Sequence, residues 1–302
     1  KIKFCYCSYM SKKKISNSFK IIHSKNQITP LIITSPHSGQ KYTKEFLEST
    51  NYNYKAYKSL EDMYVNDIIE IIKKIDITTL IALYSRAQID LNRSIHEVDE
   101  NFVELPKNYK KIKTKNTSSG IGLIPVSISS GKYLYNRRMS LDNFLDRINN
   151  IYIPWHKILE EEINKKLKLF DHCIVLDIHS MPSSVNTKDN TKLADFVIGD
   201  RSGKTCAEYI TYFLASEIKK KGYNVSYNNP FSGGYITSHY YKKYKLRNIQ
   251  TIQIEINRRL YMDESNFEKN DNFLLLQKDF YEIINKFNDF IAVDKEIKKA
   301  SE

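Results

Sequence analysis

The sequence predicts an α/β fold with a mostly parallel sheet of at most about eight strands. Short apolar runs alternate along the chain with longer segments of helical periodicity, a pattern typical of a sheet covered by helices. The 302 residues, 41% hydrophobic and 27% charged, suffice for a sizeable core. Because no repeat or Pro-, Gly- or Ser-rich linker divides the chain, we expect one domain over 1–302. Residues 1–20 are expected to be an N-terminal extension and residues 294–302 a fraying tail.

The expected strands are short runs rich in Ile, Leu, Val and Thr. They lie in residues 28–39, 78–86, 172–180, 194–200, 224–237 and 251–264, and the first and fifth of these segments run on into loops. In the last segment isoleucine alternates with polar residues from Ile252 to Asn257, so one face is apolar and the other polar. The alternation alone leaves open whether the polar face meets solvent or lines a pocket.

Helices are expected where apolar side chains recur at helical spacing, at residues 59–75, 139–170, 203–223 and 270–293. Ser59 and Ser140 are candidate N-caps, with Asp62 three residues after the first of them. Pro154 predicts a kink or break within the second helix. Gly222 predicts the end of the third.

The chain is basic, with a formal net charge of +12 and a pI of about 9.2. Such values suit a protein that binds nucleic acid or an anionic membrane. The lysines, however, fall in short scattered runs without a dense stripe, which favours a general compositional bias. We therefore expect no nucleic-acid or membrane partner, and we keep nucleic-acid binding as the non-enzymatic alternative. A basic surface also attracts small carboxylate substrates.

Cysteine usage favours a reducing compartment. Neither a zinc-ribbon spacing nor a disulfide framework is formed by Cys5, Cys7, Cys173 and Cys206. No apolar run approaches the roughly 18 residues that span a membrane, and the N-terminus lacks the apolar core of a signal peptide. We expect a cytoplasmic protein.

Polar residues collect where three predicted strands end. One apolar run leads into His37, a second into Asp177 and His179, and a third into Arg86 and the segment 90–93. In parallel sheets, ligands bind beyond the carboxyl ends of the strands. These residues are therefore candidates for one site.

His37 and His179 are candidate zinc ligands, because imidazole suits Zn²⁺ and catalytic zinc sites commonly use three protein ligands. Glu61 and Asp62 open the next predicted helix, and either could return to the same edge as the third ligand. Asp177 lies on the same strand face as His179 and could accept the other ring N–H of a ligating histidine. The remaining histidines are expected to be ordinary core or surface residues: His23, His96, His156, His172 and His239.

The arginines that follow predicted strands are Arg86, Arg93, Arg258 and Arg259. They could be surface charges or partners of Asp90, or they could clamp a substrate carboxylate, which the guanidinium group binds bidentately. Two Asn-Arg pairs, at 92–93 and 257–258, favour the clamp. The pair Asp200-Arg201 is interpreted instead as a structural turn.

Glu255 has two possible roles. A metal-activated water needs a nearby general base to attack an amide carbonyl, and glutamate can serve as that base. Alternatively, Glu255 belongs to a solvated strand face.

At these residues the sequence resembles the N-formylglutamate amidohydrolase family. The matching segments occur in the family's order over about residues 28–265: SPHSGQKY, EDMYVNDII, SRAQIDLNR, GIGLIP, LDIHSMPS, DFVIGDRSG, NNPFSGGYITSHY and QIEINRRLYMDE. The family is related to zinc carboxypeptidases and to aspartoacylase. The resemblance implies a three-layer α/β/α domain, a mixed sheet of about eight strands and one catalytic Zn²⁺.

The resemblance assigns His37 and His179 as zinc ligands. The carboxypeptidase pattern has a ligand glutamate three residues after its first histidine, but this chain has Gln40 there. Asp62 is therefore favoured as the middle ligand, with Glu61 as the alternative.

The other roles also follow from the resemblance. Glu255 resembles the general base and Arg86 the arginine that polarises the scissile carbonyl. Substrate-binding roles are implied for Asn92, Arg93, Arg258, Gly234 and Tyr235.

The implied activity is zinc-dependent hydrolysis of N-formyl-L-glutamate, or of a close N-acyl amino acid, to formate and the free amino acid, as in histidine degradation. The second enzymatic possibility is a metallo-carboxypeptidase or a peptidoglycan-type amidase on the same scaffold. Comparing formylglutamate with acyl-peptides as substrates separates the two.

Overall fold

The computed structural model describes residues 18–26, 28–50, 57–128, 133–184 and 193–300, and for 293–300 only the backbone. Most of the predicted N-terminal extension, with Cys5 and Cys7, lies outside these residues. The prediction is wrong for Phe19 and Lys20, which belong to a strand that the sequence did not reveal.

Within the described residues, the main sheet has seven strands in the order β1-β3-β2-β4-β7-β5-β6. They are β1 (Phe19–Ile22), β2 (Leu31–Ser35), β3 (Thr78–Ala82), β4 (Cys173–Met181), β5 (Phe196–Gly199), β6 (Val225–Tyr227) and β7 (Ile249–Asn257). β1 runs antiparallel to β3 and β5 antiparallel to β7, while the other pairings are parallel. The predicted mixed, mostly parallel sheet is confirmed. A separate two-stranded ribbon joins β8 (Met262–Asp263) to β9 (Glu268–Lys269).

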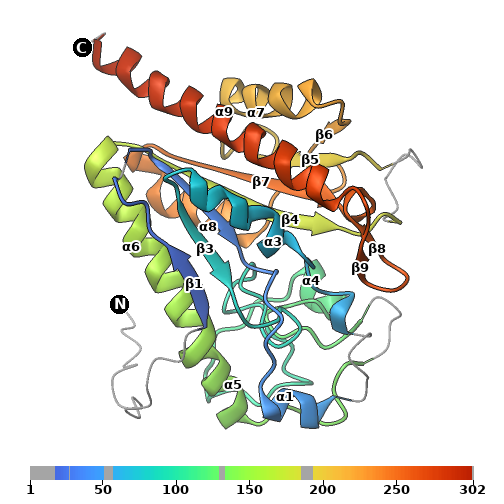
Figure 1. The fold of residues 1–302 in the computed structure, drawn as a ribbon. Helices are drawn as coiled ribbons and strands as arrows, with labels where there is room; N and C mark the ends of the chain where they lie inside the picture. Colours follow the sequence, from blue (N-terminus) through green and yellow to red (C-terminus); the bar gives the residue numbers. More distant parts are fainter. Residues whose placement is uncertain (1–17, 27, 51–56, 129–132, 185–192, 301–302) are drawn as a thin grey trace.

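Helices cover both faces of the sheet, as the three-layer prediction requires (Figure 1). One face packs against α3 (Val65–Glu70), α7 (Glu208–Lys220) and α9 (Phe273–Ala300). The other packs against α5 (Leu141–Arg147), α6 (Ile153–Phe170) and α8 (Tyr235–Tyr244). The strands alternate between the two cores: Leu31 and Ile33 of β2 enter the first and Ile32 the second.

The predicted helix at 59–75 begins later than expected. Residues 59–64 form turns, α3 starts only at Val65 after Tyr64 with φ of +62°, and a 3₁₀ turn continues over Ile71–Lys74. Ser59 is therefore not an N-cap. Tertiary hydrogen bonds explain the difference, because Arg258 donates to the carbonyl oxygens of Ser59 and Glu61 and holds the segment in a turn.

The long helical segment at 139–170 is broken as predicted. Ser140 caps α5 by accepting a hydrogen bond from the backbone N–H of Asn143. A π-helical turn at Ile148–Tyr152 then leads into α6, with Pro154 in its first turn.

Other boundaries shifted. The helix α8 begins at Tyr235, within the segment 224–237 that was predicted as a short strand and a loop. The helix α9 continues to Ala300, past the expected end at residue 293. Two short helices, α1 (Lys44–Ser49) and α4 (Lys115–Ser118), and 3₁₀ turns at Lys245–Arg247 and Arg258–Leu260 complete the described elements. Among the described residues, each helix is too short or too polar to cross a bilayer.

Candidate metal and active site

A cavity of about 800 Å³ opens beyond the carboxyl ends of the central strands, where the sequence predicted a site. The parallel register of β4 and β7 sets Asp177 beside Gln253 and His179 beside Glu255. All four side chains are on one face, because the isoleucines of β7 enter the opposite core. The polar face of β7 thus lines the cavity, and Glu255 is only 7% exposed.

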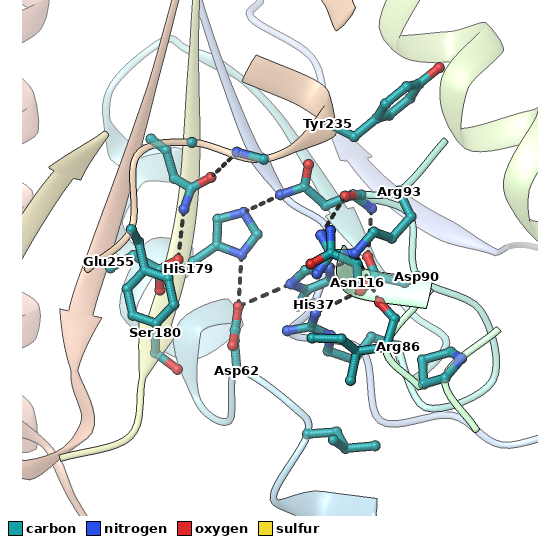
Figure 2. Close-up of a pocket in the computed structure, with 18 of the residues that line it drawn as sticks. His37, Asp62, Arg86, Asp90, Arg93, Asn116, His179, Ser180, Tyr235 and Glu255 are labelled. Atoms are coloured by element: carbon teal, nitrogen blue, oxygen red, sulfur yellow. Dashed lines mark hydrogen bonds and ion pairs between the residues drawn. The ribbon is translucent and has the colours of Figure 1, made fainter. Parts of the chain in front are cut away.

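His37, Asp62 and His179 converge at the cavity wall (Figure 2). Their ligand atoms lie within 4.8 Å of one another, and all three residues are buried. Asp62 Oδ2 is 2.9 Å from His179 Nδ1 and 3.5 Å from His37 Nδ1. His37 Nδ1 is buried and has no hydrogen-bond partner among the described residues.

Each histidine is held by a second carboxylate on its other nitrogen. His37 Nε2 lies 2.7 Å from Asp90 Oδ1, and His179 Nε2 lies 2.8 Å from Asp177 Oδ2. Both rings therefore turn Nδ1 toward Asp62. Burial alone would lower the pKa of His179, but the charge of Asp177 and hydrogen bonds to Asp177 and Asp62 raise it well above its usual value.

These residues fit a divalent metal ion. Two imidazole Nδ1 atoms and one carboxylate oxygen form a three-ligand set of the kind that catalytic zinc sites use, and His37 Nδ1, which lacks a hydrogen-bond partner among the described residues, is available for coordination. Glu61 does not join them. Its carboxylate accepts a hydrogen bond from the Tyr42 hydroxyl, and burial raises its pKa to about 7.

Gln253 fixes the carboxylate of Glu255. The backbone N–H of Gly234 donates to Gln253 Oε1 at 2.9 Å, so the amide nitrogen must face the other way. That nitrogen donates to Glu255 Oε1 at 2.7 Å. Burial raises the pKa of Glu255 to about 7, against the opposing charge of His179. A carboxyl group with this pKa can accept and return a proton near neutrality.

Asp90 also links the predicted substrate-binding segment to the site. Arg86 Nη2 donates to Asp90 Oδ2 at 2.6 Å, and the backbone N–H of Asn92 donates to Asp90 Oδ1 at 2.8 Å. The side chain of Asn92 is bound within the protein, with Nδ2 3.1 Å from His179 Nε2 and Oδ1 accepting from the N–H of Ile236.

Arg93 is positioned through backbone groups. Its Nε donates to the Ile121 carbonyl and its Nη1 to the Asn92 carbonyl. The carbonyl oxygen of Arg93 accepts a hydrogen bond from the Tyr152 hydroxyl. Arg93 lines the cavity and forms no ion pair with any described residue.

Arg258 and Arg259 differ in what they contact. Arg258 is 5% exposed and donates to Ser180 Oγ in addition to its two backbone carbonyls, so it holds the turn that carries Asp62. Its substrate-binding role stays a prediction. Arg259 pairs with Asp195 at 2.6 Å.

Two glycines allow the 230–234 loop to pack closely against the residues beside the site. A Cβ on Gly234 would lie 2.3 Å from Asn92 Nδ2, and one on Gly199 would lie 2.7 Å from the nitrogen of Gly233. Only glycine allows these approaches. Tyr235, which begins α8, also lines the cavity.

Sequence reasoning missed part of the cavity wall. The segment around GIGLIP was noticed only as a family motif, but its residues line the cavity: Asn116, Ser119, Ile121, Pro125, Ser127 and Ile128. Arg201 does form the predicted turn, yet it also lines the cavity. The other histidines contact residues outside the metal cluster, as predicted: His23, His96, His156, His172 and His239.

Comparisons with known proteins agree with this arrangement. N-formylglutamate deformylases of Pseudomonas aeruginosa and Pseudomonas putida are 26% and 25% identical to this chain, over 81% and 78% of its length and 86% and 83% of theirs. The crystal structure of N-formylglutamate amidohydrolase from Ralstonia eutropha JMP134 is 29% identical, with a TM-score of 0.84 over 91% of this chain and 99% of that one. A protein from Agrobacterium tumefaciens shares the fold at 14% identity, with a TM-score of 0.61 over 92% and 97% of the two chains.

A family model described as N-formylglutamate amidohydrolase matches residues 29–262, most of the chain. The match spans every candidate ligand and the candidate base, and it agrees with the resemblance carried by the ordered motifs. The chain therefore belongs to the N-formylglutamate amidohydrolase family.

Proposed function

We propose that this protein is a zinc-dependent amidohydrolase that cleaves N-formyl-L-glutamate to formate and L-glutamate. The observation that carries the proposal is the buried set of His37, Asp62 and His179 beside Glu255 in one cavity. Two relatives named N-formylglutamate deformylase support the choice of substrate. We further propose that the reaction takes place in the cytoplasm.

Zn²⁺ would be held by Nδ1 of His37, Nδ1 of His179 and the Asp62 carboxylate. A bound zinc ion supplies Lewis-acid polarisation of a carbonyl group and makes a water molecule more acidic. Asp90 and Asp177 keep the two imidazole rings in the tautomer that leaves Nδ1 free to coordinate.

Glu255 acts as the general base and then as the general acid. Its carboxylate, oriented by Gln253, takes a proton from the water that attacks the formyl carbon. It returns the proton to the leaving nitrogen as the C–N bond breaks. Its pKa of about 7 suits both transfers.

Arg86 and Arg93 supply positive charge around the substrate. Arg86 is fixed by Asp90 and stabilises the oxygen of the scissile carbonyl as negative charge develops on it. Arg93 has no acidic partner among the described residues and binds the α-carboxylate. Asn92 supports both arginines, because its carbonyl oxygen accepts from Arg93 Nη1 and its N–H donates to Asp90, the partner of Arg86. Its side chain is held in turn by donating to Asp177 Oδ2 and accepting from the N–H of Ile236.

The test combines elemental analysis with a formate-release assay on N-formyl-L-glutamate. We expect about one zinc per chain in the purified protein, and loss of formate release after chelation. Glu255→Gln should keep the metal and lose at least about 100-fold in kcat, the usual scale for a general base. Full turnover by Glu255→Gln with zinc bound would refute the mechanism. Faster cleavage of N-acyl peptides than of N-formylglutamate would favour the carboxypeptidase or amidase alternative.

A further inference from the structure

We infer that Arg201 binds the side-chain carboxylate of the substrate and so makes the enzyme specific for N-acyl derivatives of acidic amino acids. This inference rests on the proposed function, and it concerns a residue that the sequence interpretation treated as part of a structural turn.

Four arginines and four acidic residues line the cavity wall, and they differ in how they are paired. The described residues that line the cavity include the arginines Arg86, Arg93, Arg201 and Arg258. Arg86 is neutralised by Asp90, and Arg258 lies 3.6 Å from Asp62 while donating to two backbone carbonyls and a serine hydroxyl. Arg93 and Arg201 form no ion pair with any described residue. Glu97 and Glu255 also line the cavity, but their carboxylates accept hydrogen bonds from Ser94, Thr114 and Gln253 and form no ion pair with these two arginines. Two guanidinium groups without an ion pair therefore match the two carboxylates of N-formylglutamate.

Arg201 is held in place by a well-bonded turn. Residues 201 and 202 both have φ of +58°, a backbone conformation that side-chain-bearing residues rarely adopt. The turn is stabilised by Asp200, whose Oδ1 accepts from the N–H of Gly203 and from Asn228 Nδ2, and whose Oδ2 accepts from Thr211 Oγ1. The turn therefore holds Arg201 at the cavity wall.

The Arg201 side chain also contacts the 230–234 loop. The N–H of Arg201 donates to the Ser232 carbonyl at 2.9 Å, and its Nη1 donates to the Gly233 carbonyl at 3.1 Å. These bonds fix the direction of the guanidinium group, while its exposed side chain keeps further N–H donors for a ligand.

The two free arginines reach the cavity from different elements. Arg201 follows β5, where Gly199 pairs with Gln253, the residue that holds the catalytic base. Arg93 follows Asn92, which packs against Gly234 of the same loop. A substrate whose α-carboxylate binds Arg93 can form a second ion pair, with Arg201, only if its side chain is also anionic.

The experiment compares N-formyl-L-glutamate with N-formyl-L-glutamine, which has nearly the same shape but a neutral side chain. We expect wild-type kcat/KM to favour the glutamate substrate by about 100-fold, because only its side-chain carboxylate can form a charge-assisted hydrogen bond with Arg201. Arg201→Gln should lose about 100-fold on the glutamate substrate and change less than about threefold on the glutamine substrate. Arg201→Lys should recover part of the preference, because it restores the charge without the bidentate geometry.

Arg247→Gln is the matched control, because Arg247 is an exposed arginine whose Nη1 bonds only Asn164 among the described residues. It should retain the wild-type preference. The inference is overturned if the wild type has no preference, if Arg201→Gln keeps it, or if Arg201→Gln slows both substrates equally.

Calorimetric titration with L-glutamate and L-glutamine separates this inference from the proposed function. Weaker glutamate binding by Arg201→Gln, with no formate released by the wild type, would reject the deformylase activity and keep the carboxylate site. Formate release by the wild type, with unchanged glutamate binding by Arg201→Gln, would keep the deformylase activity and reject the carboxylate site.

Discussion

Asp90 and Asp177 hold the two candidate zinc ligands by equivalent hydrogen bonds, and replacing each by asparagine should weaken metal binding. The bonds are 2.7 Å from His37 Nε2 to Asp90 and 2.8 Å from His179 Nε2 to Asp177, and both carboxylates are buried. Loss of such an outer carboxylate typically costs 10–100-fold in metal affinity, which is about 1.4–2.7 kcal/mol. We expect Asp90→Asn and Asp177→Asn each to fall in this range.

The two variants should differ in turnover. Asp90 Oδ1 accepts from His37 and from the N–H of Asn92, so the amide oxygen of Asp90→Asn must stay there, and its NH₂ group then faces Arg86 Nη2. The NH₂ group of the new asparagine and Arg86 Nη2 are both donors, and they would face each other where the wild type has a 2.6 Å ion pair between Asp90 and Arg86. Arg86 should lose its fixed position, and kcat should fall at saturating zinc.

Asp177→Asn avoids this conflict. Asp177 Oδ1 accepts from the Thr34 hydroxyl at 2.6 Å, and a hydroxyl can rotate to accept from the new NH₂ group instead. The variant should therefore bind zinc more weakly but recover most of the wild-type kcat once zinc is saturating.

Zinc affinity would be measured by competition with a chromogenic chelator, and kcat by formate release over a zinc titration. Asp195→Asn is the control, because Asp195 pairs with Arg259 and is not among the residues that line the cavity. Unchanged zinc affinity in both test variants would refute the assignment of the ligand set, and so would an equal loss in the control.

Further predictions concern the loop, the base and a buried histidine. Gly234→Ala should lower kcat/KM for formate release by about tenfold or more, because its Cβ would displace Asn92 from its place beside His179. In a formate-release assay, kcat/KM should rise with pH through about 7, because Glu255 accepts a proton only when ionised, and a rate independent of pH between 5 and 9 would contradict this. Burial lowers the pKa of His156 to about 3, so its contribution to stability is present above its unfolded pKa of about 6.5 and is lost as pH falls toward 3. Thermal denaturation should show wild type losing about 1.6 kcal/mol more than His156→Gln between pH 6.5 and 5, and parallel losses would contradict the burial argument.

The sheet and the place of the two candidate metal histidines at its edge could be predicted because they depend on local pattern. A buried strand needs a run of apolar residues, and the histidine that follows such a run is carried to the edge of the sheet. The position of Asp62 beside the two histidines could not be predicted in this way. It depends on hydrogen bonds from Arg258, 197 residues away from Glu61 in sequence, which replace the expected helical turn.

The contact of Asp90 with His37 and the place of Arg201 in the cavity wall were missed for a related reason. An aspartate four residues after an arginine predicts a local ion pair, and that pair exists, but nothing near Asp90 in sequence reveals that its other oxygen meets His37. Arg201 lies in a turn of ordinary turn residues. Only the packing of the 230–234 loop against that turn brings it to the cavity.

The alternating strand of residues 251–257 now has a physical explanation. Its isoleucines fill the core beneath α9, which forces Gln253 and Glu255 onto the cavity face, and the parallel register aligns them with Asp177 and His179. A slip of one residue would turn every side chain of β7 to the opposite face and bury the base among apolar residues. Hydrophobic burial on one face therefore fixes the position of the polar groups on the other. The candidate metal ligand His179 and the proposed base Glu255 are positioned by a single strand pairing, because the same backbone hydrogen bonds hold both.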